Sequence, residues 1–263
     1  MSDAPEFRVL EDAGLLQIIF SRPEKLNALT DGMLVGLEDA VRLFEARADL
    51  RVLLITAEGR YFSAGRDISG GLTPDFGESA LEARRWYRTS MQRIADMIER
   101  VEKPSVVAHQ GPCMGGALEL SLSCDFRLAA RSAAYGLPEI KLGVLPGSGG
   151  ISRLARLVGP HWTRYLALAG RKIDAETARQ IGLVHEIHDD EAFGGAIQQF
   201  CRELIALPPE AVAAAKVVID LTLGSGREEG RQLDRLANGF LMLGEEYHRE
   251  VAKAVNRLKD KSR

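Results

Sequence analysis

The sequence predicts an α/β protein in which a core of repeated strand, strand, helix units precedes a C-terminal helical region. Short apolar runs alternate with patterns of helical spacing through the first half of the chain. After Gly149 the strand signals nearly vanish and helical patterns follow one another. With 263 residues, 46% of them hydrophobic, the chain can bury one large core, alone or with a small appendage.

The first predicted elements are a hairpin, a helix and a buried strand. Apolar runs at residues 7–10 and 15–20 flank a short polar stretch, which predicts the hairpin. Thr30 or Asp31 can cap the helix that follows. Its apolar residues recur at helical spacing: Leu34, Leu37, Val41 and Phe44. The strand at 52–56 then completes a βαβ-like step.

A glycine-rich loop at 59–77 leads into one long helical pattern that Pro104 stops. That helix carries the apolar residues Trp86, Met91, Ile94, Met97 and Ile98. The next expected elements are a strand at 105–108, a loop at 111–116, a short helix at 116–122, a strand at 125–129 and a strand or turn near Ala134.

The remainder of the chain reads as helices separated by breakers. The expected helices cover 152–158, 162–169, 175–181, 192–207, 210–223 and 227–258. Pro208 and Pro209 interrupt the pattern, and the last two helices are long and amphipathic. Such helices suit a subunit-contact appendage or ordinary domain helices equally well. We expect a core domain over residues 1–195 and a helical oligomerisation region over 196–263.

Composition excludes several classes of function. A formal net charge of -3 gives no reason to expect a nucleic-acid partner. The three cysteines, Cys113, Cys124 and Cys201, lack C-x-x-C spacing, so a reducing cytoplasm is expected in place of a disulfide framework. The polar start resembles no targeting segment, and every apolar run is far shorter than the roughly 20 residues that cross a bilayer.

Three glycine-containing loops stand at the ends of predicted strands, at residues 62–67, 111–119 and 145–150. Any one of them is more often an ordinary tight turn. Backbone N–H groups in such loops can also stabilise an oxyanion, and two converging donors would polarise a thioester carbonyl. Three such loops in one chain favour a ligand site.

Two glutamates are candidate acid-base groups. Glu119 lies in an otherwise apolar short helix, so its carboxyl is expected on or near a buried face, with a surface position as the equal alternative. Glu139 follows Pro138 in a loop, where local pattern alone favours a surface carboxylate. Neither residue proves catalysis by itself.

Together these segments resemble the enoyl-CoA hydratase/isomerase, or crotonase, superfamily over nearly the whole chain. The motifs that carry the resemblance are Ser21-Arg-Pro-Glu-Lys-Leu-Asn-Ala-Leu29, Phe62-Ser-Ala-Gly-Arg-Asp-Ile68, the stretch 111–125, and Tyr135-Gly-Leu-Pro-Glu-Ile-Lys-Leu-Gly-Val-Leu-Pro-Gly-Ser-Gly-Gly150. The resemblance implies a spiral of strand, strand, helix turns over about the first 190 residues, and trimers, commonly paired into hexamers, that use the C-terminal helices.

The resemblance also implies the site. Its oxyanion hole falls on the backbone N–H groups of Arg66 and Gly116, and its two acid-base residues fall on Glu119 and Glu139. Glu139 would protonate C2 of a 2-enoyl-CoA while Glu119 acts on the attacking water, with shared roles as an alternative. Expected substrate contacts are Arg22, Lys25, Ala64, Asp67, Ile68, Gly115, Pro138 and Gly147. No metal or cofactor is expected beyond the coenzyme A of the acyl-CoA substrate.

This chain departs from the family pattern at two places. The basic residue often found shortly after the Ala-Gly motif is missing, because Ile68 leads into Ser69-Gly70-Gly71. The usual Asp-Arg-x-Glu-Gly of the C-terminal tail is replaced by Tyr247-His-Arg-Glu-Val251. Contacts to the adenine end of coenzyme A are therefore left open, with Arg22 and Lys25 as weaker candidates.

Several other functions are alternatives to hydration. An isomerase needs mainly the base at Glu139, so the presence of Glu119 favours hydration, and other crotonase chemistries share the oxyanion hole. A non-catalytic acyl-CoA-binding protein is the alternative of another class. A serine hydrolase is rejected because Pro146 replaces the first glycine of G-x-S-x-G, and no nucleotide-binding glycine motif occurs.

For two further sets of residues the sequence favours a structural role over a functional one. His185 and His188 lack H-E-x-x-H spacing and suggest an exposed turn. Tyr135, Tyr247 and Phe240 could mark a specialised acyl pocket, although core packing is the simpler role for each.

Overall fold

The computed structural model describes residues 6–69, 77 and 79–261 of the chain. The chain divides into two compact units. The first comprises Met1–Val101 and Ser105–Ile205, and the second Glu102–Pro104 and Ala206–Arg263. Among the described helices, none combines the length and the apolar character that crossing a membrane requires.

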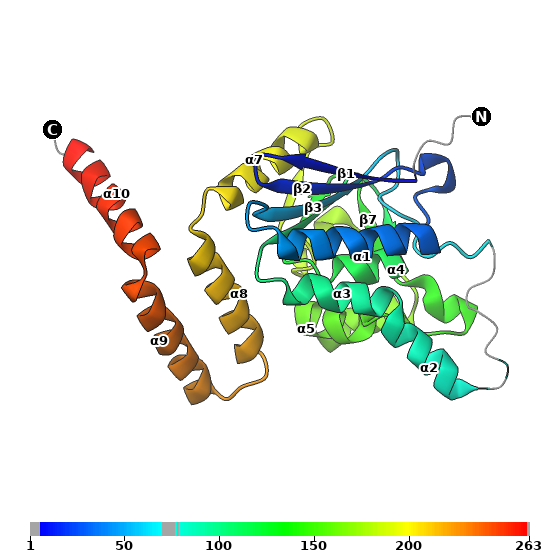
Figure 1. Ribbon diagram of the computed structural model, residues 1–263. Helices are drawn as coiled ribbons and strands as arrows, with labels where there is room; N and C mark the ends of the chain where they lie inside the picture. The colour runs from blue at the N-terminus through cyan, green and yellow to red at the C-terminus, as the bar shows by residue number, and fades with distance from the viewer. Residues whose placement is uncertain (1–5, 70–76, 78, 262–263) are drawn as a thin grey trace. The chain divides into compact units, whose positions relative to one another are not determined.

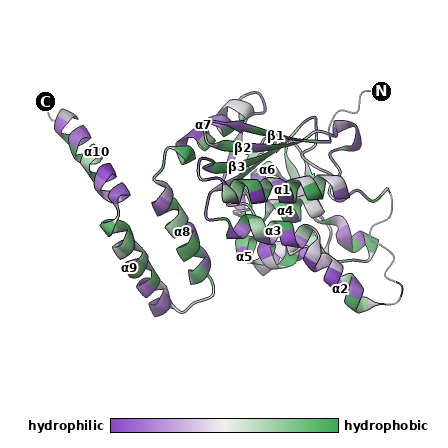
Figure 2. Cartoon of the chain, viewed as in Figure 1, coloured by the Kyte–Doolittle hydropathy of each residue, from purple (hydrophilic) through white to green (hydrophobic). Residues whose placement is uncertain are grey.

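A six-stranded sheet forms the framework of the first unit (Figure 1). Its order is β1-β2-β3-β4-β6-β9; β1 runs antiparallel to β2, and the other neighbours are parallel. The strands are β1 (Phe7–Asp12), β2 (Leu15–Phe20), β3 (Val52–Ala57), β4 (Ser105–His109), β6 (Phe126–Ala130) and β9 (Glu186–His188). The predicted hairpin is confirmed as β1 and β2. In Figure 2 the strands β2 and β3 are predominantly green, as expected for strands buried on both faces.

A second, three-stranded sheet lies in the same unit. It consists of β5 (Cys113–Met114), β7 (Ala134–Gly136) and β8 (Lys172–Asp174), in the order β5-β7-β8. The chain passes from β4 to β5 and from β6 to β7, so the strands from β4 to β7 alternate between the two sheets. The expected repetition of strand, strand, helix units is therefore confirmed.

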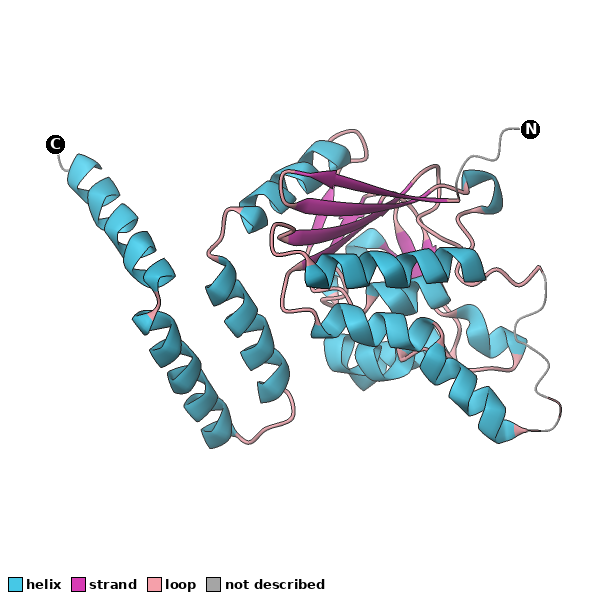
Figure 3. Ribbon diagram, in the orientation of Figure 1, coloured by secondary structure: helices cyan, strands magenta, loops and turns pink. Residues whose placement is uncertain are grey.

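Helices pack on both faces of the large sheet (Figure 3). Those of the first unit are α1 (Asp31–Ala46), α2 (Ala80–Thr89), α3 (Met91–Arg100), α4 (Gly116–Ser121), α5 (Gly150–Thr163), α6 (Ala175–Gln180) and α7 (Phe193–Ile205). Thr30 caps α1, because its hydroxyl oxygen accepts a hydrogen bond from the Met33 N–H at 3.1 Å.

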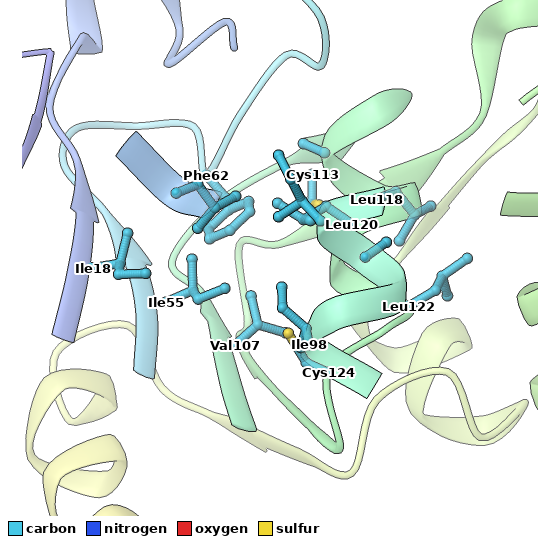
Figure 4. Close-up of a cluster of buried hydrophobic side chains, with 14 of the residues drawn as sticks. Ile18, Ile55, Phe62, Ile98, Val107, Cys113, Leu118, Leu120, Leu122 and Cys124 are labelled. Carbon is cyan, nitrogen blue, oxygen red and sulfur yellow. The ribbon is translucent and has the colours of Figure 1, made fainter. Parts of the chain in front are cut away.

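The main core lies between the large sheet and helices α1, α3 and α4. Figure 4 shows Ile18, Ile55 and Val107 of three adjacent strands together with Leu118 and Leu120 of α4. These side chains are close to fully buried, so truncating one to alanine would cost about 2–5 kcal/mol. A smaller cluster packs the opposite face of the sheet against α7. The first residues of α4 are thereby held against a rigid core.

The second unit is helical, and the helical region expected over residues 196–263 also takes in most of α7, which belongs to the first unit. The helices of the second unit are α8 (Pro209–Thr222), α9 (Arg227–Leu243) and α10 (Glu245–Lys261), along which apolar and hydrophilic residues are interspersed (Figure 2). The carboxylate of Glu246 accepts hydrogen bonds from the N–H groups of Glu210 and Ala211 at 3.1 and 3.3 Å. A residue of α10 thus satisfies the open start of α8.

Two helices predicted as continuous are broken. The long pattern before Pro104 divides into α2 and α3, because Ser90 has a non-helical backbone with φ −107° and ψ −136°. The last predicted helix divides into α9 and α10 at Gly244, which has extended backbone angles. Apolar periodicity alone continues across both breaks, so it could not locate them.

The strands β8 and β9 were missed by the sequence analysis. Each has only three residues, which is too short to show alternation. Of the two histidines expected in an exposed turn, His185 is exposed in a bend, whereas His188 is half-buried in a strand. His188 lies in β9 beside β6, and His185 accepts a hydrogen bond from the Arg127 N–H at 3.1 Å.

Candidate active site

A pocket of about 200 Å³ opens beside the N-terminus of α4. Nine of the twelve expected site residues line it: Ala64, Arg66, Ile68, Gly115, Gly116, Glu119, Pro138, Glu139 and Gly147. They come from three separate loops and two short helices, so the fold brings together all three glycine-containing loops. The predicted glycine-rich loop at 59–77 contributes Ala64, Arg66 and Ile68 to the lining, and its residues 70–76 lie outside the described part of the chain.

Two backbone N–H groups lie close together in the pocket lining. Gly65 has φ +99°, and a Cβ atom built there would lie 2.8 Å from the Met114 carbonyl oxygen and 3.3 Å from the Gly116 nitrogen. Only glycine tolerates both this backbone angle and this close approach. Within the described residues, the N–H groups of Arg66 and Gly116 donate to no acceptor. They are available to a carbonyl oxygen of a ligand.

The side chain of Arg66 takes no part in this arrangement. Its guanidinium donates to the carbonyl oxygen of Leu29 at 3.0 Å and pairs with Asp31 at the start of α1. The backbone around it is fixed by the Leu29 N–H, which donates to the Gly65 carbonyl at 2.8 Å. The predicted importance of the backbone over the side chain at this position fits the geometry.

Glu119 is buried, as the first of the two interpretations held, with only 3% of its surface exposed. Its Oε2 atom accepts hydrogen bonds from the N–H groups of Ser148 at 2.7 Å and of Gly150 at 3.0 Å. Burial, and then the charge of Glu139, raise the pKa of Glu119 to about 7. The two N–H groups and Arg153 oppose that rise by favouring the ionised carboxylate.

Glu139 lies in the 3-10 helix η2 (Pro138–Leu142), which follows β7. Its Oε1 atom lies against Gly115, where a Cβ would come within 2.8 Å of it. Its Oε2 atom is buried and has no hydrogen-bond partner among the described residues. Burial raises the pKa of this carboxyl above its ordinary value. The surface position favoured by local pattern is therefore wrong, because β7 carries the loop into the pocket.

The pocket has an aromatic and aliphatic wall. Trp86 and Tyr87 of α2, whose rings pack edge to face with centroids 5.0 Å apart, form part of it. Further apolar lining residues include Leu34, Met91, Leu142, Val144 and Leu145. Sequence analysis missed Tyr87, although adjacent aromatic residues in an otherwise charged helix are a signal that could have drawn attention to it.

Arg22, Lys25 and Asp67 do not line the pocket. Arg22 instead donates to Asp67 at 3.0 Å, to the Ala28 carbonyl at 2.8 Å and to Glu6 at 2.9 Å. The Ser69 hydroxyl and N–H, and then Arg22, hold the pKa of Asp67 below its usual range. This pair joins the Ala-Gly loop to the segment before α1, while Lys25 is exposed.

The aromatic residues considered earlier lie elsewhere. Tyr135 is fully buried in the core, and its hydroxyl contacts the His109 Nδ1 atom at 3.1 Å, so core packing is confirmed for it. Phe240 and Tyr247 belong to the second unit and are 76% and 38% exposed, so core packing is wrong for both.

Comparison with known proteins identifies the family to which a chain with this fold and these site residues belongs. The family model described as enoyl-CoA hydratase/isomerase matches residues 11–255. The chain belongs to this family. It is thus an enzyme of the enoyl-CoA hydratase/isomerase family, and its fold is the crotonase fold.

Individual members of the family agree in length and differ in activity. The chain is 34% identical over 228 residues to a crotonyl-CoA hydratase of Syntrophomonas wolfei, covering 86% of this chain and 83% of the relative. It is 32% identical over 236 residues to the 1,2-epoxyphenylacetyl-CoA isomerase of Escherichia coli, covering 86% and 87%. A crystal structure of enoyl-CoA hydratase from Thermoplasma volcanium superposes with a TM-score of 0.84 at 32% identity, covering 94% of this chain and 96% of that chain.

Proposed function

We propose that this protein adds water across the C2–C3 double bond of a 2-enoyl-CoA thioester. One observation carries the proposal: the same pocket is lined by two carboxyl groups with raised pKa values and by two backbone N–H groups that have no acceptor among the described residues. Hydration needs an oxyanion site for the thioester oxygen, a base for the water and an acid for C2. Each requirement has a candidate group.

The environments of the two carboxyls support different roles. Glu119 accepts two backbone hydrogen bonds, which stabilise its ionised form, whereas the buried Oε2 atom of Glu139 lacks any partner in the described structure and favours a protonated carboxyl. A proton on Glu139 also removes the charge that raises the pKa of Glu119. We therefore assign Glu119 as the base and Glu139 as the acid.

The chemical step follows from these roles. Glu119 takes a proton from water while the water oxygen bonds to C3, and the π electrons move onto the thioester oxygen. The N–H groups of Arg66 and Gly116 stabilise the resulting enolate. Glu139 then delivers its proton to C2 as the carbonyl reforms. The step consumes one water and needs no electron acceptor, so we propose that no metal or redox cofactor takes part.

The remaining expectations extend this proposal. Ala64, Ile68, Gly115, Pro138 and Gly147 would contact the acyl-CoA, with exposed Lys25 near its phosphates. Arg22 and Asp67 would act by fixing the loop. We also propose a cytoplasmic homotrimer or dimer of trimers. Its support is a stripe of exposed apolar residues at helical spacing in α9 and α10: Leu236, Phe240, Leu243, Tyr247, Val251, Val255 and Leu258.

The test is the loss of enoyl-thioester absorbance with crotonyl-CoA and with longer or aromatic 2-enoyl-CoAs, combined with the product mass. A gain of one water is expected from the wild-type enzyme, and Glu119→Gln should lower kcat at least 100-fold with little change in acyl-CoA affinity. Exposed Glu203 of α7 offers the matched control Glu203→Gln, which should retain full activity.

Other results would contradict hydration. A shifted double bond without added mass identifies an isomerase, and binding without turnover identifies an acyl-CoA-binding protein. Full activity of Glu119→Gln would refute the assignment of Glu119.

A further inference from the structure

The phenol ring of Tyr87 rests directly on the loop that holds Glu119. A Cβ atom built at Gly147 would lie 2.6 Å from the Cε1 atom and 3.0 Å from the Cζ atom of Tyr87. The next residue, Ser148, donates its N–H to Glu119 at 2.7 Å. The break at Ser90 ends α2 just after Tyr87, so Tyr87 approaches the pocket from a different helix than α3.

Among the described residues, the hydroxyl of Tyr87 is a hydrogen-bond donor without an acceptor. Tyr87 is half-buried and lines the pocket, and its hydroxyl has no hydrogen-bond partner in the part of the chain that the structure describes. Burial, then the charge of Glu119 and then that of Glu139, raise its pKa. The phenol therefore stays protonated at neutral pH and can donate in both directions of a reaction.

The position of the Tyr87 hydroxyl limits which ligand atoms it can contact. The thioester oxygen is assigned to the N–H groups of Arg66 and Gly116, which belong to other segments than the loop that Tyr87 contacts. Glu119 already accepts two hydrogen bonds at Oε2. The substrate oxygen that must come close to both carboxyls is the one that joins C3.

We propose that Tyr87 donates a hydrogen bond to the oxygen at C3, first as the attacking water and then as the hydroxyl of the product. This inference rests on the proposed hydration. Water in this position donates one hydrogen to Glu119, accepts from Tyr87 and keeps a second lone pair directed at C3. In the reverse direction the same donor stabilises the departing oxygen. Tyr87 is thus a third catalytic residue and selects ligands with oxygen at C3.

The effect should appear as a preference between two ligands that differ by one hydroxyl. A site built to hydrogen-bond a ligand oxygen discriminates against the analogue that lacks it. In a Glu119→Gln background, which blocks turnover, calorimetry would compare 3-hydroxybutyryl-CoA with butyryl-CoA. Adding Tyr87→Phe should reduce the preference for the hydroxy ligand about tenfold, because one hydrogen bond is lost, and should leave the butyryl-CoA affinity unchanged.

Kinetics provide the second measurement. In the otherwise wild-type enzyme, Tyr87→Phe should lower kcat for crotonyl-CoA about 10- to 100-fold at nearly constant KM, in the range typical of one transition-state donor. Exposed Tyr165 is the matched control, and Tyr165→Phe should change neither quantity. Phenylalanine retains the ring on Gly147, so unfolding temperatures should agree. Gly147→Ala, which displaces the ring, should reproduce the reduced ligand preference.

An unchanged preference for 3-hydroxybutyryl-CoA in the Tyr87→Phe background overturns the inference, as does an unchanged kcat. Failure of the proposed function looks different, because it removes hydration of crotonyl-CoA in the wild-type enzyme itself. The ligand preference is measured without turnover, so the two failures cannot be confused.

Discussion

Glu119 and Gly150 are in direct contact across the pocket wall. The Gly150 N–H donates to the Oε2 atom of Glu119 at 3.0 Å, and a Cβ atom at position 150 would lie 2.7 Å from the Cγ atom of Glu119. It would also lie 2.9 Å from the Cβ of Pro146. Buried atoms at such distances have to move, so the absence of a side chain at Gly150 allows the Glu119 carboxyl to occupy its position.

Gly150→Ala should therefore displace the Glu119 carboxyl and lower kcat on crotonyl-CoA by about 100-fold, because small displacements of a positioned group are costly in rate. The control is Gly195→Ala in α7, where a Cβ meets no atom within 4 Å. That variant should keep full activity. Steady-state kinetics of both variants decide the matter, and an active Gly150→Ala enzyme would show that the carboxyl tolerates displacement.

Protonation of Glu119 at low pH should lower the activity. Glu119 must be ionised to accept a proton from water, so kcat/KM should decline on the acid side with a midpoint between the ordinary 4.5 and about 7. Arg153 lowers the pKa of Glu119, and its guanidinium donates to the Ser148 carbonyl at 3.0 Å. Arg153→Gln should move this midpoint to higher pH, whereas exposed Arg156→Gln should leave it in place. A midpoint unmoved by Arg153→Gln would contradict this electrostatic role.

The raised pKa of Glu119 also links stability to pH. Because the folded pKa exceeds the unfolded value, the native state binds the proton more tightly, and this stabilisation is present below pH 4.5 and is lost as the pH rises through about 7. Glu119→Gln does not titrate. Its free energy of unfolding relative to wild type should rise by roughly 3 kcal/mol between pH 4.5 and pH 8. Urea unfolding at both pH values measures this, and a constant difference would contradict the raised pKa.

The sequence could locate those parts of the site whose residues belong to short local motifs. Gly65 and Gly116 mark loops with steric demands, and Glu119 is conspicuous as a charge within an apolar helix. Tyr87 could not be placed, because its approach to Gly147 depends on the break at Ser90 and on the packing of two distant segments.

The large sheet, too, could be predicted only where its strands are evident from their own residues. Long apolar strands such as β2 and β3 were evident, whereas β9 is defined by its pairing with β6 more than by its own three residues. Arg22 and Asp67 were expected at the substrate. Their side chains instead form an ion pair with each other, although 45 positions separate them in the sequence, and only the folded structure shows this pairing.

The assignment of Glu139 to C2 can be separated from that of Glu119 with a substrate that cannot be hydrated. Butyryl-CoA has acidic hydrogens at C2 but no double bond, so its exchange with D₂O requires the oxyanion N–H groups and a base at C2 alone. Glu139→Gln should slow this exchange at least 100-fold, whereas Glu119→Gln should retain it, since the water-activating group has no part in enolate formation. Mass spectrometry of the recovered thioester counts the deuterium. Equal loss in both variants would mean that the two carboxyls share the proton at C2. Their environments differ, because Glu119 accepts from two N–H donors and the buried Oε2 atom of Glu139 has no partner among the described residues, but this difference would then not separate their roles.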